Sequence, residues 1–217
     1  MSNRLSDLQQ DFLKAFFSRE ARFFLTGGAA LVGFHLGHRE THDLDLFTLE
    51  DALDAGAALT AEIARQWGAS LESIQTYPDF RRLLLHRNDE AIVIDLVRER
   101  VAQITSEKPL VNGIRVDPPE EILANKLCAL LSRSEVRDLV DVRALEASGY
   151  RIEDALPAAS LKDTGLTPAQ LSWILSQIEI GDDLVPPGGV LAEELRQYLA
   201  GLISRLTQLA FPTIKKV

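Results

Sequence analysis

The strongest constraint on the fold is the segment 22–48, in which two short strand patterns flank a glycine turn and a helix. Residues 22–26 (RFFLT) have the pattern of a buried strand, Gly27-Gly28 interrupts it, and AALVGFHLGH from Ala29 favours a helix that begins directly afterwards. The next strand pattern, 43–48 (DLDLFT), alternates polar and apolar residues, which is typical of a strand with one covered face. Strand, turn, helix and strand in this order predict a sheet covered by helices.

The residues around this segment predict the rest of an α/β half. An apolar stripe at helical spacing predicts a helix over Leu5 to Arg19, and Asp51 to Trp67 has helical composition. Three strand patterns follow, with Asn88-Asp89 as the turn between the last two: Leu71 to Tyr77, Phe80 to Arg87 and Ala91 to Val97.

The pattern changes near Asp117. One short strand, Ile114 to Val116, lies between Asn112-Gly113 and Pro118-Pro119, and no strand pattern follows it. We therefore expect an α/β domain over residues 1–116 and a helical domain over residues 117–217. The helices expected in the second domain are Glu120 to Ser132, Glu135 to Ser148, Ile152 to about Leu156, Pro168 to Ile178 and Val190 to Leu209.

Composition excludes several classes of protein. The 217 residues are 46% hydrophobic, so the chain can bury a core, and its one cysteine, Cys128, cannot form an internal disulfide. A charged N-terminus and the lack of a long apolar run favour a cytoplasmic protein without a membrane span. A formal charge of −9 disfavours a surface for long duplex nucleic acid, but it permits a local basic pocket.

Three aspartates form a candidate metal site. Asp43 and Asp45 are two apart on a predicted strand and point to the same side, so together they suit a hard divalent cation. Asp95 lies inside the apolar run AIVIDLV, where an ionised carboxylate needs a metal or a charged partner. The alternatives are a solvated strand edge or a helix cap for the first two, and an ion pair with Arg82 or Arg98 for Asp95.

Gly27 and Gly28 form a candidate phosphate site. Glycines at the head of a helix expose backbone N–H groups at the positive end of the helix dipole, although a tight turn alone also needs such residues. Arg39, just before the aspartate strand, is a cation that could meet phosphate there. A zinc site built from the nearby histidines is disfavoured, because no thiolate accompanies them and the adjacent carboxylates suit magnesium better.

Two stretches resemble one known family. The run LTGGAALVGFHLGHRETHDLDLFT is similar to the signature of the AbiEii/AbiGii-type nucleotidyltransferase toxins, within the polymerase-beta-like superfamily. NKLCALLSRSEVRDLVDVRAL resembles the family's later motif, a lysine-bearing helix followed by an Arg-Asp-x-x-Asp helix. The chain departs from the pattern at Ala29, where the family often has threonine, and in the long spacing from Gly28 to Asp43.

The resemblance implies an α+β fold, with a polymerase-beta-like mixed sheet and helices followed by a C-terminal helical bundle. It also implies magnesium as the cofactor. The roles implied are magnesium binding by Asp43 and Asp45; phosphate contact by Gly27 and Gly28; triphosphate binding by Lys126 and Arg133; and a place near the reacting centre for Asp138. Asp95 is added to the metal site because of its own position in an apolar strand. A solvated helix face for Lys126, and a salt-bridge network for Asp138 and Asp141, are the structural alternatives.

The activity implied is transfer of a nucleoside monophosphate from an NTP to an acceptor hydroxyl, with release of pyrophosphate. By the toxin resemblance the acceptor is a tRNA 3′ end, and a separate protein acts as antitoxin. An RNA acceptor calls for a basic strip, for which the candidates are Arg81, Arg82, Arg98, Arg100, Arg133 and Arg137. The alternatives are an enzyme that modifies a small molecule of the antibiotic kind, or a silent nucleotide-binding partner protein.

Overall fold

The computed structural model describes residues 4–212 and divides the chain into two compact units. The first unit comprises the residues up to 101 together with 105–118, and the second comprises 102–104 and the residues from 119 onward. The main division therefore falls between Pro118 and Pro119, next to the boundary expected near Asp117.

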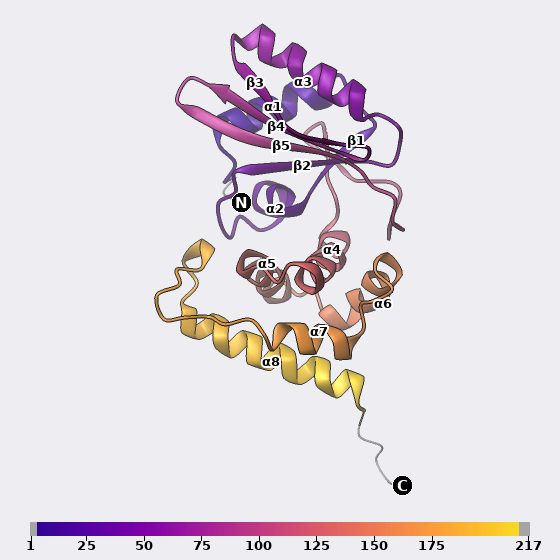
Figure 1. Cartoon of the computed structure of the whole chain (residues 1–217), viewed down its shortest axis with the longest axis vertical. Coiled ribbons are helices and arrows are strands. Elements are labelled where there is room, and N and C mark those ends of the chain that lie inside the picture. The colour runs from indigo at the N-terminus through magenta and orange to yellow at the C-terminus, as the bar shows by residue number, and fades with distance from the viewer. Residues whose placement is uncertain (1–3, 213–217) are drawn as a thin grey trace. The chain divides into compact units, whose positions relative to one another are not determined.

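The first unit is built on a five-stranded mixed sheet, shown in the upper part of Figure 1. The strand order is β1-β2-β5-β4-β3, in which β2 and β5 run parallel and the other neighbours run antiparallel. The strands are β1 (Phe23–Thr26), β2 (Asp43–Thr48), β3 (Ser70–Tyr77), β4 (Phe80–Arg87) and β5 (Glu90–Arg98).

One face of this sheet forms the core under α1 (Asp7–Phe17) and α3 (Leu53–Trp67), and Figure 1 shows both helices on that side. Alternate residues of the central strands are wholly buried there, including Leu44, Leu46 and Ile94. Helix α1 contributes aromatic rings to the same core, because the Phe16 ring packs edge-on to that of Phe23 with centroids 5.4 Å apart. The residues between these core positions point to the opposite face.

That opposite face carries the glycine turn. Helix α2 (Gly27–Ala30) follows β1 directly and continues as a π-helix over Leu31–His35, on the side of the sheet away from α1 and α3 (Figure 1). The helix therefore begins at the glycines rather than at Ala29, since Gly27 itself makes the turn. A small hairpin of β6 (Leu110–Val111) and β7 (Ile114–Arg115) completes the unit, and its first strand was not expected from the sequence.

The second unit consists of helices, as expected for the C-terminal half. They are α4 (Pro119–Ser132), α5 (Val136–Ala147), α6 (Ile152–Lys162), α7 (Pro168–Leu175), a 3-10 turn (Pro187–Gly189) and α8 (Ala192–Ala210). Helix α6 is longer than expected and passes through Pro157, because Ala155, Leu156 and Ala159 are buried and the helix packs against α4. Within residues 4–212, no helix combines the length and apolar character that a membrane span requires.

Candidate active site

The three predicted metal-site aspartates lie on one face of the sheet. Asp43 and Asp45 are both half-buried on β2, and Asp45 pairs in register with Asp95 on the parallel strand β5. Residues paired across neighbouring strands project to the same side, so Asp95 faces the same way as the other two. The structure thus brings together acids that lie 50 residues apart in the sequence.

Asp95 is bound by an arginine. Arg82 on β4 is its cross-strand neighbour and forms a two-pronged ion pair, with Nε 2.8 Å from Oδ1 and Nη2 2.7 Å from Oδ2. Asp95 is 5% exposed, and this pair explains how its charge is tolerated there. Of the two partners considered from the sequence, Arg82 is therefore the one observed, whereas Arg98 pairs with Asp51.

The electrostatics of Arg82 link it to all three acids. The hydrogen bond to Asp95 is the main cause that raises the pKa of the guanidinium, and the charges of Asp95, Asp43 and Asp45 raise it further against the opposing effect of burial. Arg82 also lies against the ring of Phe80, with the guanidinium carbon 5.6 Å from the ring centroid. The positive charge of Arg82 therefore interacts with the negative charges of Asp43 and Asp45.

Gly27 allows the carboxylate of Asp45 to approach the turn. Its φ of +64° lies in the left-handed region, which side chains disfavour. A Cβ atom at this position would also lie 2.2 Å from Oδ2 of Asp45, a distance that real contacts do not reach. Glycine is therefore required here for two independent reasons, and both concern the predicted phosphate site.

Gly28 is covered by the predicted cation, Arg39. A Cβ at Gly28 would lie 2.6 Å from Nη2 of Arg39 and 3.4 Å from Oγ1 of Thr41. Arg39 is only 5% exposed, and its Nη1 donates a hydrogen bond of 2.8 Å to the carbonyl of Glu40. The guanidinium is thus held against the glycine turn.

Only some of the carboxylates on this sheet face are placed to bind a divalent metal. Asp43 and Asp45 offer carboxylate oxygens, which magnesium prefers, from one side of one strand. Both oxygens of Asp95, by contrast, already accept hydrogen bonds from Arg82. In the described part of the chain, no three His, Cys, Asp or Glu side chains are arranged to hold a metal ion together. The fit is therefore to a two-carboxylate site on β2.

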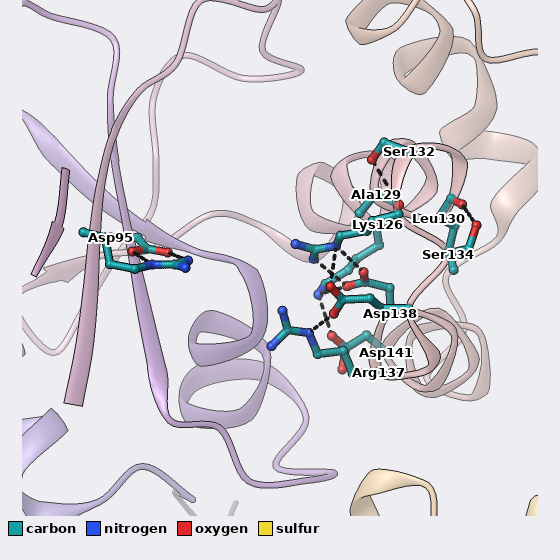
Figure 2. A network of polar contacts seen from close by, with 12 residues as sticks. Asp95, Lys126, Ala129, Leu130, Ser132, Ser134, Arg137, Asp138 and Asp141 are labelled. Atoms are coloured by element: carbon teal, nitrogen blue, oxygen red, sulfur yellow. Dashed lines mark hydrogen bonds and ion pairs between the residues drawn. The ribbon is translucent and has the colours of Figure 1, made fainter. Parts of the chain in front are cut away.

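The second predicted group forms a buried charge cluster in the helical unit (Figure 2). Nζ of Lys126 on α4 lies 2.6 Å from Oδ1 of Asp138 and 2.7 Å from Oδ2 of Asp141, both on α5. Both aspartates are wholly buried and the lysine is 6% exposed. Arg133 adds a second cation, with Nε 2.8 Å from Oδ2 of Asp138. The salt-bridge network considered from the sequence is therefore present.

The ionisation of Asp138 reflects this cluster. Burial is the largest single effect on its pKa and acts to raise it. The charge of Lys126 and the hydrogen bonds from Arg133 and Lys126 outweigh burial, so the pKa lies below the ordinary value. Asp138 is thus held as a carboxylate.

The six arginines proposed for a basic strip are each paired with an acid. Arg81 and Arg82 are neighbours on β4 and project to opposite faces of the sheet, so the two cannot belong to one strip. The pairs are Arg81 with Asp54, Arg82 with Asp95, Arg98 with Asp51, Arg100 with Asp79, Arg133 with Asp138 and Arg137 with Glu135.

Comparison with known proteins now decides the family. A model of the family described as nucleotidyl transferase AbiEii toxin, type IV toxin–antitoxin system, matches residues 11–208. The chain belongs to this family. It is accordingly a nucleotidyltransferase of the toxin class, as the resemblance implied. A search of curated proteins gives no significant match.

Solved structures share the fold across nearly the whole chain. MenT4, a nucleotidyltransferase toxin of Mycobacterium tuberculosis, is 17% identical with a TM-score of 0.65, and the match covers 93% of this chain and 82% of that one. A candidate nucleotidyltransferase of Helicobacter pylori is 17% identical with a TM-score of 0.62, covering 98% and 100% of the two chains. JHP933 from Helicobacter pylori is 21% identical with a TM-score of 0.57, covering 95% and 96%. These likenesses confirm the α+β fold class.

Proposed function

We propose that this chain is a magnesium-dependent enzyme that transfers a nucleoside monophosphate from an NTP to an acceptor hydroxyl. The observation that supports this most is the convergence of Asp43 and Asp45 with the Gly27-Gly28 turn and Arg39 on one face of the sheet. Carboxylates for a metal, backbone N–H groups for phosphate and a fixed cation are the parts that phosphoryl-type transfer needs.

Each of these residues has a defined task. Asp43 and Asp45 would hold the metal, which when bound would offset phosphate charge and favour ionisation of the attacking hydroxyl. Gly27 and Gly28 bring the backbone of the turn close to Asp45 and Arg39, where its N–H groups and the guanidinium of Arg39 would meet phosphate oxygens. The acceptor oxygen forms a bond to the α-phosphorus, the bond to pyrophosphate breaks, and a carboxylate of the aspartate pair takes up the hydroxyl proton.

The roles of Lys126, Arg133 and Asp138 rest on the family resemblance. The resemblance assigns the two cations to the triphosphate and Asp138 to the reacting centre. In the structure their charges bind one another inside the helical unit. Those roles therefore stay predictions, which substitution experiments must separate from a structural role.

For the acceptor we propose an RNA, with the tRNA 3′ end as the first substrate to test and an antitoxin as a functional partner. Membership of a toxin–antitoxin family supports this choice. The net charge of −9 and the pairing of the six arginines favour the alternative, a small-molecule acceptor. We therefore treat the two acceptor classes as arms of one experiment.

The test is incubation of the protein with each α-labelled NTP and magnesium, with total cellular RNA in one arm and aminoglycoside-type small molecules in the other. We expect labelled RNA, loss of label transfer in EDTA, and loss in a folded Asp45→Asn variant. Transfer to the small molecules alone would replace the RNA assignment. Full transfer by Asp45→Asn, or in EDTA, would remove the metal assignment.

A further inference from the structure

Arg82 lies on the sheet face that carries Asp43, Asp45 and Asp95, and the family resemblance gives it no role. Asp95 takes two of its five N–H groups, and no hydrogen bond from the other three occurs among residues 4–212. The Arg82 side chain is 41% exposed, whereas that of Asp95 is 8% exposed. The guanidinium is therefore anchored on its inner side and keeps donors on its accessible side.

The anchor fixes the direction of the guanidinium. A two-pronged arginine–carboxylate pair sets the plane of the guanidinium, and the Phe80 ring lies against it. Because Arg82 on β4 and Asp45 on β2 both lie opposite Asp95 on β5, the cation is on the same row across the sheet as Asp45, with one strand between them. An oxyanion held at Asp43 and Asp45 through a metal would meet a cation that needs little reorganisation.

The same pair makes Asp95 a poor third ligand for the metal. Its two oxygens are occupied, and a metal on either of them would stand directly beside the guanidinium charge. A metal could bind Asp95 fully only if Arg82 left a carboxylate that is almost wholly buried.

We infer that Arg82 is a phosphate-binding residue of this site, and that Asp95 is a positioning residue that holds Arg82 rather than a ligand of the metal. The ligand class is the triphosphate of a nucleotide. The inference rests on the proposed function, because it places the nucleotide at the Asp43 and Asp45 face.

The test measures metal and nucleotide separately, without turnover. Mn²⁺ binding is followed by electron paramagnetic resonance without nucleotide, and binding of each of four non-hydrolysable fluorescent NTP analogues is followed at saturating Mg²⁺. The variants are Arg82→Gln, the charge-neutral double variant Arg82→Gln/Asp95→Asn, and Arg81→Gln as the matched control. Arg81 is the next residue on β4, points to the other face and pairs with a solvated Asp54.

We expect Arg82→Gln to weaken analogue binding roughly ten- to hundredfold, as loss of charge-assisted hydrogen bonds does, while Arg81→Gln changes it less than about threefold. The double variant should bind the analogue as Arg82→Gln does, because Asp95 acts only through Arg82. It should keep Mn²⁺ affinity within about threefold, since it removes a neutral pair and no ligand.

A Mn²⁺ affinity of the double variant reduced by about tenfold or more would make Asp95 a ligand and overturn the inference. Unchanged analogue binding by Arg82→Gln would overturn it as well. The double variant also serves as a control for misfolding. Arg82→Gln alone removes the arginine partner of the buried Asp95 carboxylate, whereas the double variant removes that carboxylate as well. If the wild-type protein bound neither Mn²⁺ nor any analogue, the proposed function would fail along with the inference, whereas either of the first two results would leave the proposed function in place.

Discussion

The Gly27 turn offers a sharp test of the site, because the chain contains a matched control. Gly27 and Gly68 have the same φ of +64°, so alanine at either position brings the same left-handed strain, about 1–2 kcal/mol. Only Gly27 has a neighbour, since its added Cβ would lie 2.2 Å from Oδ2 of Asp45, whereas nothing lies within 4 Å of a Cβ at Gly68. The difference between the two variants isolates displacement of Asp45.

The size of that displacement follows from the distances. Ordinary contact begins near 3.4 Å, so the Asp45 carboxylate has to retreat by more than 1 Å when alanine replaces Gly27. A misplacement of about 1 Å in an active site lowers the rate on the order of a hundredfold. We therefore expect Gly27→Ala to lose about two orders of magnitude in label transfer and Gly68→Ala to keep it within about threefold.

The assay combines label transfer with urea unfolding of both variants. The expected signature is a similar loss of stability and very different activity. If Gly27→Ala retained as much label transfer as Gly68→Ala, catalysis would not depend on the present position of the Asp45 carboxylate. The argument from the glycine turn would then be refuted.

Three further predictions concern the helical unit. Lys126→Met leaves two wholly buried carboxylates without their lysine and should lower the free energy of unfolding by about 3–5 kcal/mol in urea titrations, a result that a loss below about 1 kcal/mol would contradict. The pKa of Asp138 is lower in the folded protein than the unfolded value of 3.8. The ionised carboxylate therefore stabilises the fold above pH 3.8, and this stabilisation is lost as the pH falls through the folded pKa. Asp138→Asn should accordingly reduce the decrease in unfolding free energy on acidification. Tyr198→Phe removes a hydroxyl that donates to Glu146 at 2.6 Å and should cost about 1–2 kcal/mol in the same titrations, and no change would show that Arg205 alone satisfies Glu146.

Much of the sheet could be predicted because its signals are local. The strand patterns at 43–48 and 80–87 gave the bounds that β2 and β4 have in the structure, and the alternation in β2 also indicated which of its faces is buried. Helix α6 was expected too short, because Pro157 suggests an end to a helix and the packing that overrides it involves a distant helix.

The pairing of charges depends on strand register in addition to strand patterns. The sequence left Asp95 with a metal, Arg82 or Arg98 as its partner, because the choice depends on which residue of β4 lies opposite it. That register follows from the two-residue turn Asn88-Asp89, which pairs Arg87 with Glu90 and therefore Arg82 with Asp95. The sequence indicated this turn, so counting back from it is the signal that could have selected Arg82. From the sequence, Arg82 was considered only as a partner of Asp95 and as part of a basic strip, and not as a phosphate-binding residue of the site.

The two charge clusters differ in what they can still bind. Lys126 has three N–H donors, of which two are directed to Asp138 and Asp141, and its side chain is 7% exposed. To reach a phosphate, as the resemblance implies, the ammonium would have to leave two wholly buried carboxylates, at a cost that grows with their burial. Arg82 faces no such exchange, because its remaining donors already lie on the accessible side of its pair. Phosphate affinity in the unreacted enzyme should therefore depend more on Arg82 than on Lys126, and analogue binding in a Lys126→Arg variant that folds measures whether the lysine adds to it.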